Sequence, residues 1–460
     1  MYTSFNKAIL SIGIALFCLT DVSAQTQNPS LDDYITIAFQ QNKGLKQQEF
    51  DLDKSLYALK EAKSMYMPTV SVLGGYTKSS GGRTIDLPLG DLLNPVYQSL
   101  NQLSGKNTFP TIANQTVNFN ADNFYDAKVR TSLPLINAEI KYNKLIKQQL
   151  ITNQQAAVNV YKRALVKDIK TAYYRYYQAQ QGIAVYNSAL LLIKENIREN
   201  ESLLRNGVRN GTALLRSQTE QQKTLASLVQ AQHNTKNAGS YFNFLLNRPL
   251  NDTIQIDTTA ISRLITEPDT TQGSSRREEL KQLQIMQQVY TLDYKMQKSG
   301  IIPKLNTYVD LGSQGFDFTV NNKSRYYVWG VNLQWDVFTG GQRKYRAAQS
   351  KASFNSATAQ LDETQQALQL ELDQSYHNYQ SAKAAYKSIT AQLGFATKYY
   401  NDQKKAYRAG QLLYLELIDA ENQLTSARLQ LAEAQANLQI TLAELERGQA
   451  SYPITNSNPK

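Results

Sequence analysis

Apolar side chains recur at steps of three and four residues along most of this chain. One such run is Leu165, Ile169, Ala172, Tyr176, Ala179, Ile183, Tyr186, Leu190, Ile193 and Ile197. A second run is Leu417, Ala420, Leu424, Ala427, Leu431, Ala434 and Leu438. This spacing is typical of a coiled-coil seam, in which side chains of one helix fill holes on a neighbour. No proline interrupts the chain between Pro134 and Pro249 or between Pro303 and Pro453, so both stretches can form very long helices.

The seams predict two long helices, each followed by a shorter helix that returns. The long helices are expected over residues 139–206 and 341–409, and the returning helices over 212–247 and 412–446. Another short helix precedes each half, over 31–64 and 275–300, the first of them opened by the capping pair Ser30 and Asp33. Two short helices stacked end to end would match one long helix. The chain is therefore predicted to supply four helical columns of similar height.

Four other segments alternate apolar and polar residues, as β-strands with one apolar face do. The clearest is Tyr327, Trp329, Val331, Leu333, Trp335 and Val337. The others are Val129, Thr131, Leu133 and Leu135; Leu305, Thr307, Val309 and Leu311; and, more weakly, Val70, Val72 and Tyr76. Each has about the length that a tilted strand needs to cross a bilayer, although half-buried strands of a soluble sheet would alternate in the same way. Lipid tolerates no unpaired strand edge, so membrane strands of this number would have to be pooled by several copies of the chain.

The two halves of the chain repeat one another. Met67-Pro68 and Ile302-Pro303 open corresponding strands, and the long helices stop at Arg205-Asn206-Gly207 and Arg408-Ala409-Gly410. Each half is then one unit that buries its apolar faces beside copies of itself. The predicted organisation is a signal peptide (1–24), a first repeat (25–250, strand hairpin 68–136), a linker (251–274), a second repeat (275–448, strand hairpin 303–338) and a disordered tail (449–460).

The first residues have the pattern of a secretory signal. Lys7 is followed by the short apolar stretch 8–19 and by the small-residue cleavage site Val22-Ser23-Ala24. The only cysteine, Cys18, lies inside this segment, so the mature chain is expected to have no thiol and no disulfide. The net charge of +11 is spread along the helices rather than gathered in a patch, which argues against nucleic-acid binding.

Catalytic chemistry has little support in the sequence. His233 and His377 are each isolated on a helical stretch, and the scattered carboxylates share no evident pocket. Residues 104–108 mimic a phosphate-binding loop, but Leu100 stands where the first glycine belongs. We therefore expect no catalytic residues, no metal and no cofactor, and the chain is not expected to be an enzyme.

The order of these features resembles the TolC family of bacterial outer-membrane efflux channels. The resemblance rests on the duplicated strand and coiled-coil plan, the proline opening each first strand, Thr339-Gly340-Gly341 after the last strand, and the Tyr-x-x-Gly turn at Tyr407 to Gly410. It covers the chain from Leu31 to about Gly448. It implies an α+β membrane protein: a trimeric twelve-stranded transmembrane β-barrel, with four strands per protomer, continuous with a long periplasmic α-helical coiled-coil barrel.

The resemblance also implies a location and partners. The location is the outer membrane of a Gram-negative bacterium, with a large periplasmic portion. The partners are two further copies of the chain, outer-membrane lipid, a periplasmic adaptor, and an inner-membrane efflux pump or ABC transporter. The channel would be the exit duct of a tripartite efflux or type I secretion system, passively conducting drugs, small molecules or proteins. A secreted coiled-coil scaffold or adhesin is the alternative, but it leaves the amphipathic strands without a purpose.

In the family, acidic residues six and nine positions after each turn glycine line a constriction. After Gly410 these residues are Glu416 and Asp419, whereas after Gly207 they are Ala213 and Arg216. Carboxylates from three protomers in one narrow pore would repel one another and attract cations. We hypothesise that Arg216 pairs with Asp419 or Glu416 of a neighbouring coil. Tyr407, which matches the family's latch tyrosine, is expected to hydrogen-bond in that network. Solvated residues on an exposed helix end are the alternative.

The helix turns are the predicted docking points for the adaptor, because they would be the exposed periplasmic ends. The residues are Gly207, Val208, Gly211, Thr212, Gly410, Gln411, Leu412 and Leu415. The segment 78–123 is predicted to be a long loop outside the cell, and its role stays open.

Overall fold

The computed structural model describes residues 30–208, 210–257 and 274–454 of the 460-residue chain. The predicted signal peptide, Cys18 and most of the predicted linker lie outside the described residues. The described chain forms two compact units. One comprises the described residues 30–40, 172–208, 210–257 and 396–436, and we call it the coil unit. The other comprises the described residues 41–171, 274–395 and 437–454, and we call it the sheet unit.

Three long helices contribute residues to both units. They are α4 (Ala138–Arg205), α8 (Gln342–Arg408) and α9 (Tyr414–Gln449). Each unit therefore contains helices from both sequence repeats. The predicted repeats are duplicated in sequence, but each compact core is built jointly by the two.

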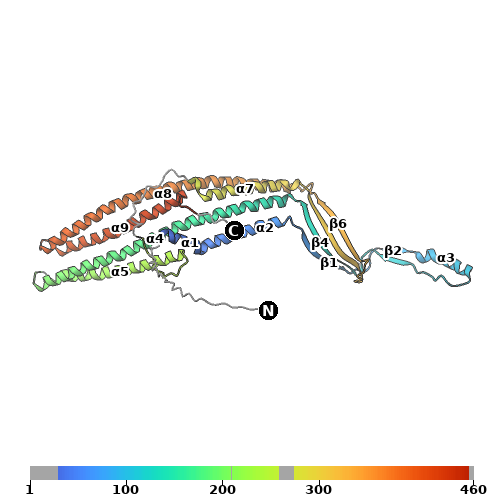
Figure 1. Cartoon of the computed structure of the whole chain (residues 1–460), viewed down its shortest axis with the longest axis horizontal. Helices are drawn as coiled ribbons and strands as arrows, with labels where there is room; N and C mark the ends of the chain where they lie inside the picture. Colours follow the sequence, from blue (N-terminus) through green and yellow to red (C-terminus); the bar gives the residue numbers. More distant parts are fainter. Residues whose placement is uncertain (1–29, 209, 258–273, 455–460) are drawn as a thin grey trace, which may run out of the picture. The chain divides into compact units, whose positions relative to one another are not determined.

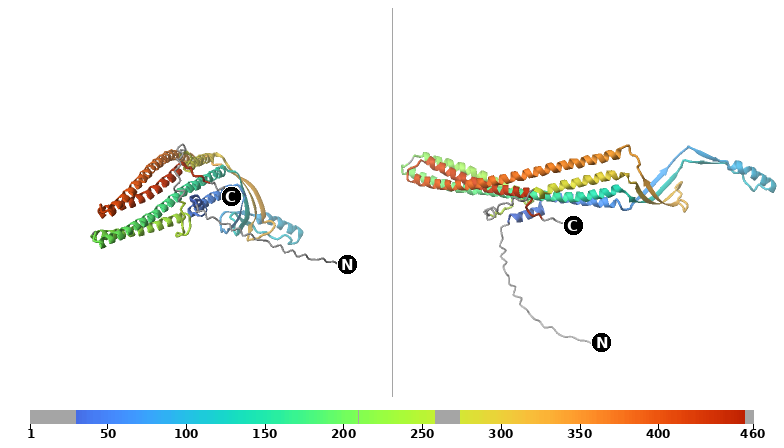
Figure 2. Two further views of the ribbon diagram at one scale, coloured as in Figure 1. Left: turned by 60° about the vertical axis from the view of Figure 1, so that its left-hand side comes forward. Right: turned by 90° about the horizontal axis from the view of Figure 1, so that it is seen from above.

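The coil unit is built from α1 (Leu31–Gln41), α5 (Thr212–Leu245), the second half of α4, the end of α8 and the start of α9. In Figures 1 and 2, α5 lies along α4, and α9 lies along the end of α8. The apolar positions of the predicted seam form its core: Leu190, Ile193, Leu417, Ala420, Leu424 and Ala427 are all buried. Packing between helices thus follows the period read from the sequence.

The predicted first helix, 31–64, is divided in two at Asn42. Here the backbone is extended (φ −60°, ψ 124°), and the Asn42 side chain accepts a hydrogen bond of 2.9 Å from the Leu45 amide. Asparagine is among the best residues for this capping position, so α2 (Lys43–Ser64) begins anew after it. The Ser30–Asp33 capping pair at the start of α1 is confirmed, with Ser30 N donating to the Asp33 carboxylate at 2.8 Å.

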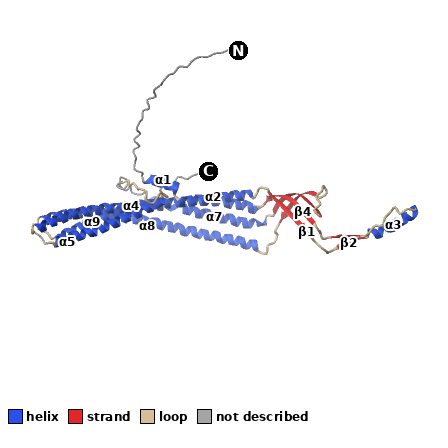
Figure 3. Cartoon of the chain, turned by 90° about the horizontal axis from the view of Figure 1, so that it is seen from below, coloured by secondary structure: helices blue, strands red, loops and turns tan. Residues whose placement is uncertain are grey.

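The sheet unit carries four antiparallel strands in the order β1-β4-β5-β6. They are β1 (Thr69–Thr77), β4 (Phe124–Ile136), β5 (Lys304–Phe316) and β6 (Arg325–Gln334). Figure 3 shows these strands gathered at one end of the helices of this unit, which include α2 and α7 (Glu278–Lys298). Two short 3-10 turns flank α7 in the chain: η1 (Ser274–Arg276) precedes it and η2 (Ser299–Ile301) follows it. The last strand ends at Gln334, so Trp335 and Val337 of the predicted strand lie beyond it.

The register of the sheet aligns the alternating apolar residues of all four strands. Val72 pairs with Val129, Val129 with Leu311, and Leu311 with Tyr327. Because side chains on directly paired residues share a face, these residues form one apolar row across the sheet. The next row is Val70, Thr131, Val309 and Trp329. This face is bare in the protomer: Val72 is 81% exposed, Tyr327 79% and Trp329 68%.

The predicted long loop 78–123 contains regular structure and is not an irregular loop. It holds β2 (Thr84–Leu87), α3 (Leu89–Ser104) and β3 (Gln115–Asn118), and β2 pairs with β3. Asparagine side chains tie α3 to the returning chain: the Asn94 amide donates to the Ile112 carbonyl at 2.9 Å, and the Asn101 amide donates to the Phe109 carbonyl at 2.8 Å. These side-chain contacts have no periodic pattern, which is why the sequence did not predict them.

The start of the predicted disordered tail is also ordered. Helix α9 continues to Gln449, and the Tyr452 carbonyl accepts a hydrogen bond of 2.9 Å from Arg163. Lys170 lies over the Tyr452 ring at 4.9 Å. Residues 449–452 therefore pack against α4 within the sheet unit.

Candidate functional site

The predicted gating and docking residues lie at the turns of the coil unit. Gly207 and Gly410 both have left-handed backbone (φ 68° and 73°), the helix-ending conformation that glycine adopts without steric cost. Around these turns Val208 and Leu415 are 65% and 53% exposed. The other predicted docking residues of these turns, Gly211, Thr212, Gln411 and Leu412, are exposed or half-buried. Apolar side chains that face solvent at a helix turn are available to a partner.

The three charged residues of the predicted constriction are all exposed. Glu416 and Asp419 lie in the first turns of α9, and Arg216 lies near the start of α5. Asp419 accepts a hydrogen bond of 2.7 Å from Gln423. Within the described residues of one chain, Arg216 makes no ion pair, so its pairing with an acidic residue stays a prediction.

Tyr407 lies at the centre of a buried hydrogen-bond network. Its side chain is 2% exposed, and its hydroxyl donates to the side-chain amide oxygen Oδ1 of Asn200. The side-chain amide of Asn200 donates a hydrogen bond of 2.8 Å to the Ser217 hydroxyl. The Ser217 hydroxyl in turn donates to the Tyr414 hydroxyl at 2.6 Å. The Tyr407 and Tyr414 rings are 5.5 Å apart. The network joins α4, α5, α8 and α9, and burial raises the pKa of Tyr414 to about 12.

Ion pairs join α8 to α4 beside this network. Arg408 contacts Glu195 at 2.7 Å and Glu199 at 3.4 Å, and Lys404 contacts Glu195 at 2.9 Å. The hydrogen bond from Lys404, together with the charge of Arg408, holds the pKa of Glu195 below its usual range. These groups are partly exposed, so their contribution to stability is small and sensitive to salt.

Glu421 on α9 is the most unusual titratable group of the coil unit. It is only 4% exposed, and one carboxylate oxygen accepts a hydrogen bond of 2.7 Å from Asn196. The other oxygen, Oε1, has no hydrogen-bond partner among the described residues. Burial, with Glu220 nearby, raises the pKa of Glu421 to about 8, although Lys404 opposes the shift. Glu421 therefore holds a proton through much of the neutral range.

A buried tyrosine lies close to Glu421. Tyr400 on α8 is 4% exposed, and its hydroxyl has no hydrogen-bond partner in the described part of the chain. Burial, and then the negative charge of Glu421, raise the pKa of Tyr400. Buried polar atoms without partners are costly, so Tyr400 and Glu421 Oε1 lower the stability of this layer of the helix packing.

Sequence reasoning did not find Asn196, Asn200, Ser217 or Glu421. A signal was nevertheless present for Asn196, Asn200 and Glu421, because these polar residues stand at seam spacing. Asn196 and Asn200 follow Ile193 by three and seven positions, and Glu421 follows Leu417 by four. A polar residue on an otherwise apolar seam fixes register at a cost in stability, and it is a place to look for function.

The sheet unit has a charged face opposite its apolar face. Arg130 donates two hydrogen bonds of 2.7 Å to Asp310, its partner on the next strand, and the guanidinium lies 4.8 Å from the Tyr308 ring. Asp126 accepts hydrogen bonds from Lys128 at 2.5 Å and from Tyr326 at 2.7 Å. One side of the sheet is therefore suited to hydrocarbon and the other to water.

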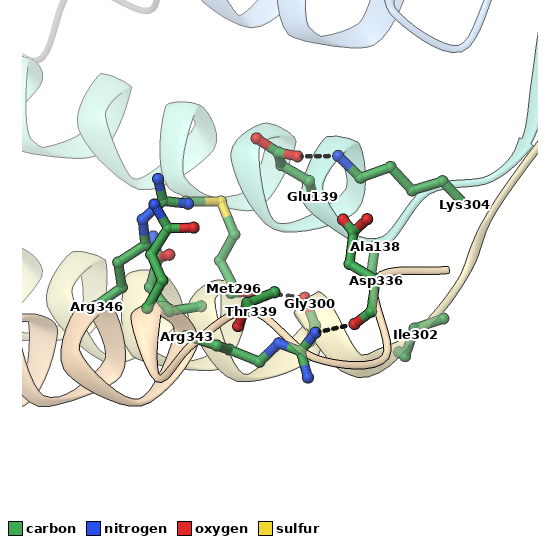
Figure 4. Close-up of a pocket in the computed structure, with 13 residues that line it drawn as sticks. Ala138, Glu139, Met296, Gly300, Ile302, Lys304, Asp336, Thr339, Arg343 and Arg346 are labelled. Carbon is green, nitrogen blue, oxygen red and sulfur yellow. Dashed lines mark hydrogen bonds and ion pairs between the residues drawn. The ribbon is translucent and has the colours of Figure 1, made fainter. Parts of the chain in front are cut away.

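Figure 4 shows where helices and strands meet in the sheet unit. Lys304, at the start of β5, forms an ion pair of 2.8 Å with Glu139 at the start of α4. Arg343, in the first turn of α8, donates to the Asp336 carbonyl at 2.6 Å. These contacts fix how the strands leave the helices. None of the helices in the described ranges is both long and apolar enough to span a membrane.

Comparisons with known proteins agree with these features. The model of the outer membrane efflux protein family matches residues 272–448, which make up the second repeat. No curated protein sequence matches the chain. Among solved structures, the outer-membrane channel OprN has 18% sequence identity to this chain and a TM-score of 0.74. The matched region covers 92% of this chain and 90% of the OprN chain.

Two further channels have the same fold. CmeC, the outer-membrane channel of Campylobacter jejuni, has 13% identity and a TM-score of 0.73, covering 98% of this chain and 94% of its own. MtrE, the outer-membrane channel of Neisseria gonorrhoeae in its open state, has 14% identity and a TM-score of 0.72. The matched region covers 92% of this chain and 89% of the MtrE chain. At such identities these likenesses establish the fold and not the substrate.

The family model thus matches the second repeat, and the solved channels share the fold of nearly the whole chain. The predicted resemblance to the TolC-type outer-membrane efflux proteins is confirmed, and the fold of the protomer agrees with the predicted α+β fold class. The expectation that the chain is not an enzyme agrees with this family. The first repeat lies outside the family match, and its likeness to these channels is one of fold.

Proposed function

We propose that three copies of this chain form the exit duct of a tripartite export system in the outer membrane of a Gram-negative bacterium. The four strands of each protomer would contribute to one closed barrel of twelve. The turns of the coil unit would dock on a periplasmic adaptor that is coupled to an inner-membrane pump or ABC transporter. The duct conducts drugs, other small molecules or proteins passively, since energy comes from the pump.

The observation that carries this proposal is the sheet with one bare apolar face. A soluble protomer would bury the row that contains Val72, Leu311 and Tyr327, because a contiguous exposed apolar surface of this kind favours association. Lipid solvates such a face without cost. The opposite face carries the Arg130–Asp310 pair, as expected for a water-filled lumen.

The outer edges of β1 and β6 support a multi-chain barrel. Within the described residues each of these strands pairs along one side, with β4 and β5 respectively. A sheet in lipid needs every backbone group paired. Joining β1 of one copy to β6 of the next closes the sheet and leaves no edge.

The constriction is proposed at the coil turns, with Glu416 and Asp419 facing the pore. Arg216 would pair with one of these carboxylates across coils and help to hold the closed state. Tyr407 would stabilise the same closed packing through Asn200. Replacing Arg216 with Ala and finding conductance and gating unaltered would exclude the Arg216 pairing.

The direct test of the channel is the behaviour of the mature protein in membranes. We expect it to extract from outer membranes with detergent as a trimer and to give stepwise ion conductance in planar bilayers. A matched pair of variants isolates the lipid-facing side. Val331→Lys charges the apolar face and should cost roughly 2–4 kcal/mol of barrel stability, whereas the neighbouring Asn332→Lys, on the other face, should be tolerated.

Two outcomes would overturn the proposal. One is a monomer that is stable in water without detergent, as expected of a secreted coiled-coil scaffold or adhesin. The other is an equal response to Val331→Lys and Asn332→Lys, which would mean that neither face is set apart by lipid.

A further inference from the structure

A groove in the sheet unit combines an apolar floor with positive charge. It lies where η2 and the chain after β6 meet α7 and the start of α8. Its apolar side chains face solvent to an unusual degree: Phe338 is 88% exposed, Val337 71% and Ile301 63%. Trp335, whose indole donates to the Ile301 carbonyl at 3.1 Å, holds one wall in place.

Four cations line this groove, and none of its twelve lining residues is acidic. The cations are Lys298, Arg343, Lys344 and Lys351. The whole chain has 49 basic and 38 acidic residues, so a groove of this composition is not an average piece of surface. Among the described residues none of the four forms an ion pair. Arg343 donates to a backbone carbonyl (Figure 4), and Lys298 and Lys351 lie over aromatic rings at 4.8 and 4.6 Å.

The start of α8 adds a second reason to expect an anion. Its first residues are Gln342, Arg343 and Lys344, with no acidic residue in the first turn. Positive side chains at a helix N-terminus are disfavoured by the helix dipole, whereas an anion there is favoured. The corresponding helix of the first repeat, α4, instead has the acidic residue Glu139 in its first turn. The second repeat thus departs from the usual pattern in the direction that suits a bound anion.

We propose that this groove binds one anionic phospholipid of the periplasmic leaflet, with its phosphate among the four cations and its acyl chains on Phe338, Val337 and Ile301. The inference rests on the proposed function, because strands that cross the membrane place this junction at the periplasmic interface. Only an amphiphile satisfies both halves of the groove: a free anion leaves the apolar floor bare, and an apolar partner leaves the cations without a counter-ion.

The test uses the intact trimer purified in neutral detergent. It is incubated with equal amounts of phosphatidylglycerol and phosphatidylcholine carrying the same acyl chains, and native mass spectrometry counts the lipids retained. We expect up to one phosphatidylglycerol per protomer, retained several-fold over phosphatidylcholine. The triple variant K298Q/K344Q/K351Q should lose that preference, while Phe338→Gln should lower retention of both lipids.

The matched control is K194Q/K236Q/K398Q, which removes three exposed lysines of the coil unit and the same net charge. It should retain phosphatidylglycerol as the unmodified trimer does. Equal retention of the two lipids by the unmodified trimer, or equal loss in both triple variants, would overturn the site. Conductance of the same samples separates the two proposals: a conducting trimer without lipid preference overturns only the site, whereas absence of a trimer overturns the channel and the site together.

Discussion

The two repeats end in the same backbone turn but bury different side chains beside it. Three positions before the turn glycine, the first repeat has Leu204, 38% exposed, and the second has Tyr407, 2% exposed. Ten positions after it, Ser217 and Ala420 are both 0% exposed. One position further, Gln218 is exposed whereas Glu421 is buried.

The difference shows that a shared backbone plan can carry unequal roles. The second repeat inserts polar side chains, Tyr407 and Glu421, into the core, and both bind asparagines of the first repeat. The first repeat's equivalents, Leu204 and Gln218, make no such insertion. Contacts at the turns of the coil unit therefore join unlike side chains of the two repeats, and each contact can be removed separately.

The largest effect is expected from truncating the buried tyrosine. Tyr407→Ala removes a fully buried ring and a hydrogen bond, and it should cost roughly 3 kcal/mol of local stability. The equivalent Leu204→Ala should cost under about 1 kcal/mol because Leu204 is partly exposed. The measurement is the rate of protease cleavage at the coil turns, together with the loss of helical signal on heating. Equal sensitivity of the two variants would contradict the asymmetry of the repeats.

The next effect depends on pH and concerns Glu421. Its folded pKa of about 8 is above the usual value of 4.5, so the folded chain keeps a proton that the unfolded chain releases. The contribution of Glu421 to stability is then largest at acidic pH, and it falls as pH rises from about 4.5 to about 8. Glu421→Gln should remove this fall, raising the melting temperature at pH 8.5 by several degrees and changing it little at pH 5.

The groups around Glu421 come from every helix packed against it: Glu195 of α4, Glu220 of α5, and Lys404 and Tyr400 of α8. Gln218→Glu is the matched control, because it places a carboxylate at the equivalent but exposed position of the first repeat. It should leave the pH dependence of melting unchanged. A pH-independent effect of Glu421→Gln would mean that Glu421 is ionised in the folded protein.

A smaller effect, on ion selectivity, is expected when an acidic residue is introduced at position 216 of the first repeat. Arg216→Asp replaces the cation by the residue found at the corresponding position of the second repeat, Asp419. We expect the cation-to-anion permeability ratio to rise, roughly twofold, because three added carboxylates would attract cations. Asp419→Asn should shift the ratio the other way. Reversal potentials in a salt gradient measure both, and unchanged values in both variants would exclude these residues from the pore.

The smallest effect is expected from the exposed ion pairs. A double-mutant cycle of Glu195→Ala and Arg408→Ala should give a coupling of about 0.5 kcal/mol that disappears at high salt. Arg205 stands in the first repeat where Arg408 stands in the second, and it has no ion pair in the described residues, so Arg205→Ala is the control. A coupling above about 2 kcal/mol would show that the pair is effectively desolvated in the assembly.

Local sequence patterns predict the helices and strands of this chain and indicate the class of protein that it resembles. The long helices were predicted over 139–206 and 341–409 and are observed at Ala138–Arg205 and Gln342–Arg408, because helical period and proline spacing are local properties. The four strands were found for the same reason. The order of these elements is enough to indicate a resemblance to the TolC-type family.

Which residues come into contact depends on the folded chain. A seam specifies that a helix packs, but not which neighbour it faces or at what rotation. For that reason the partner of Tyr407 is Asn200 of the other repeat, and Glu421 is buried while Gln218 is not. The end of the helix at Asn42 and the ordered segment with α3 likewise depend on single side-chain contacts to the backbone. Such contacts have no period, so only the folded chain brings them together.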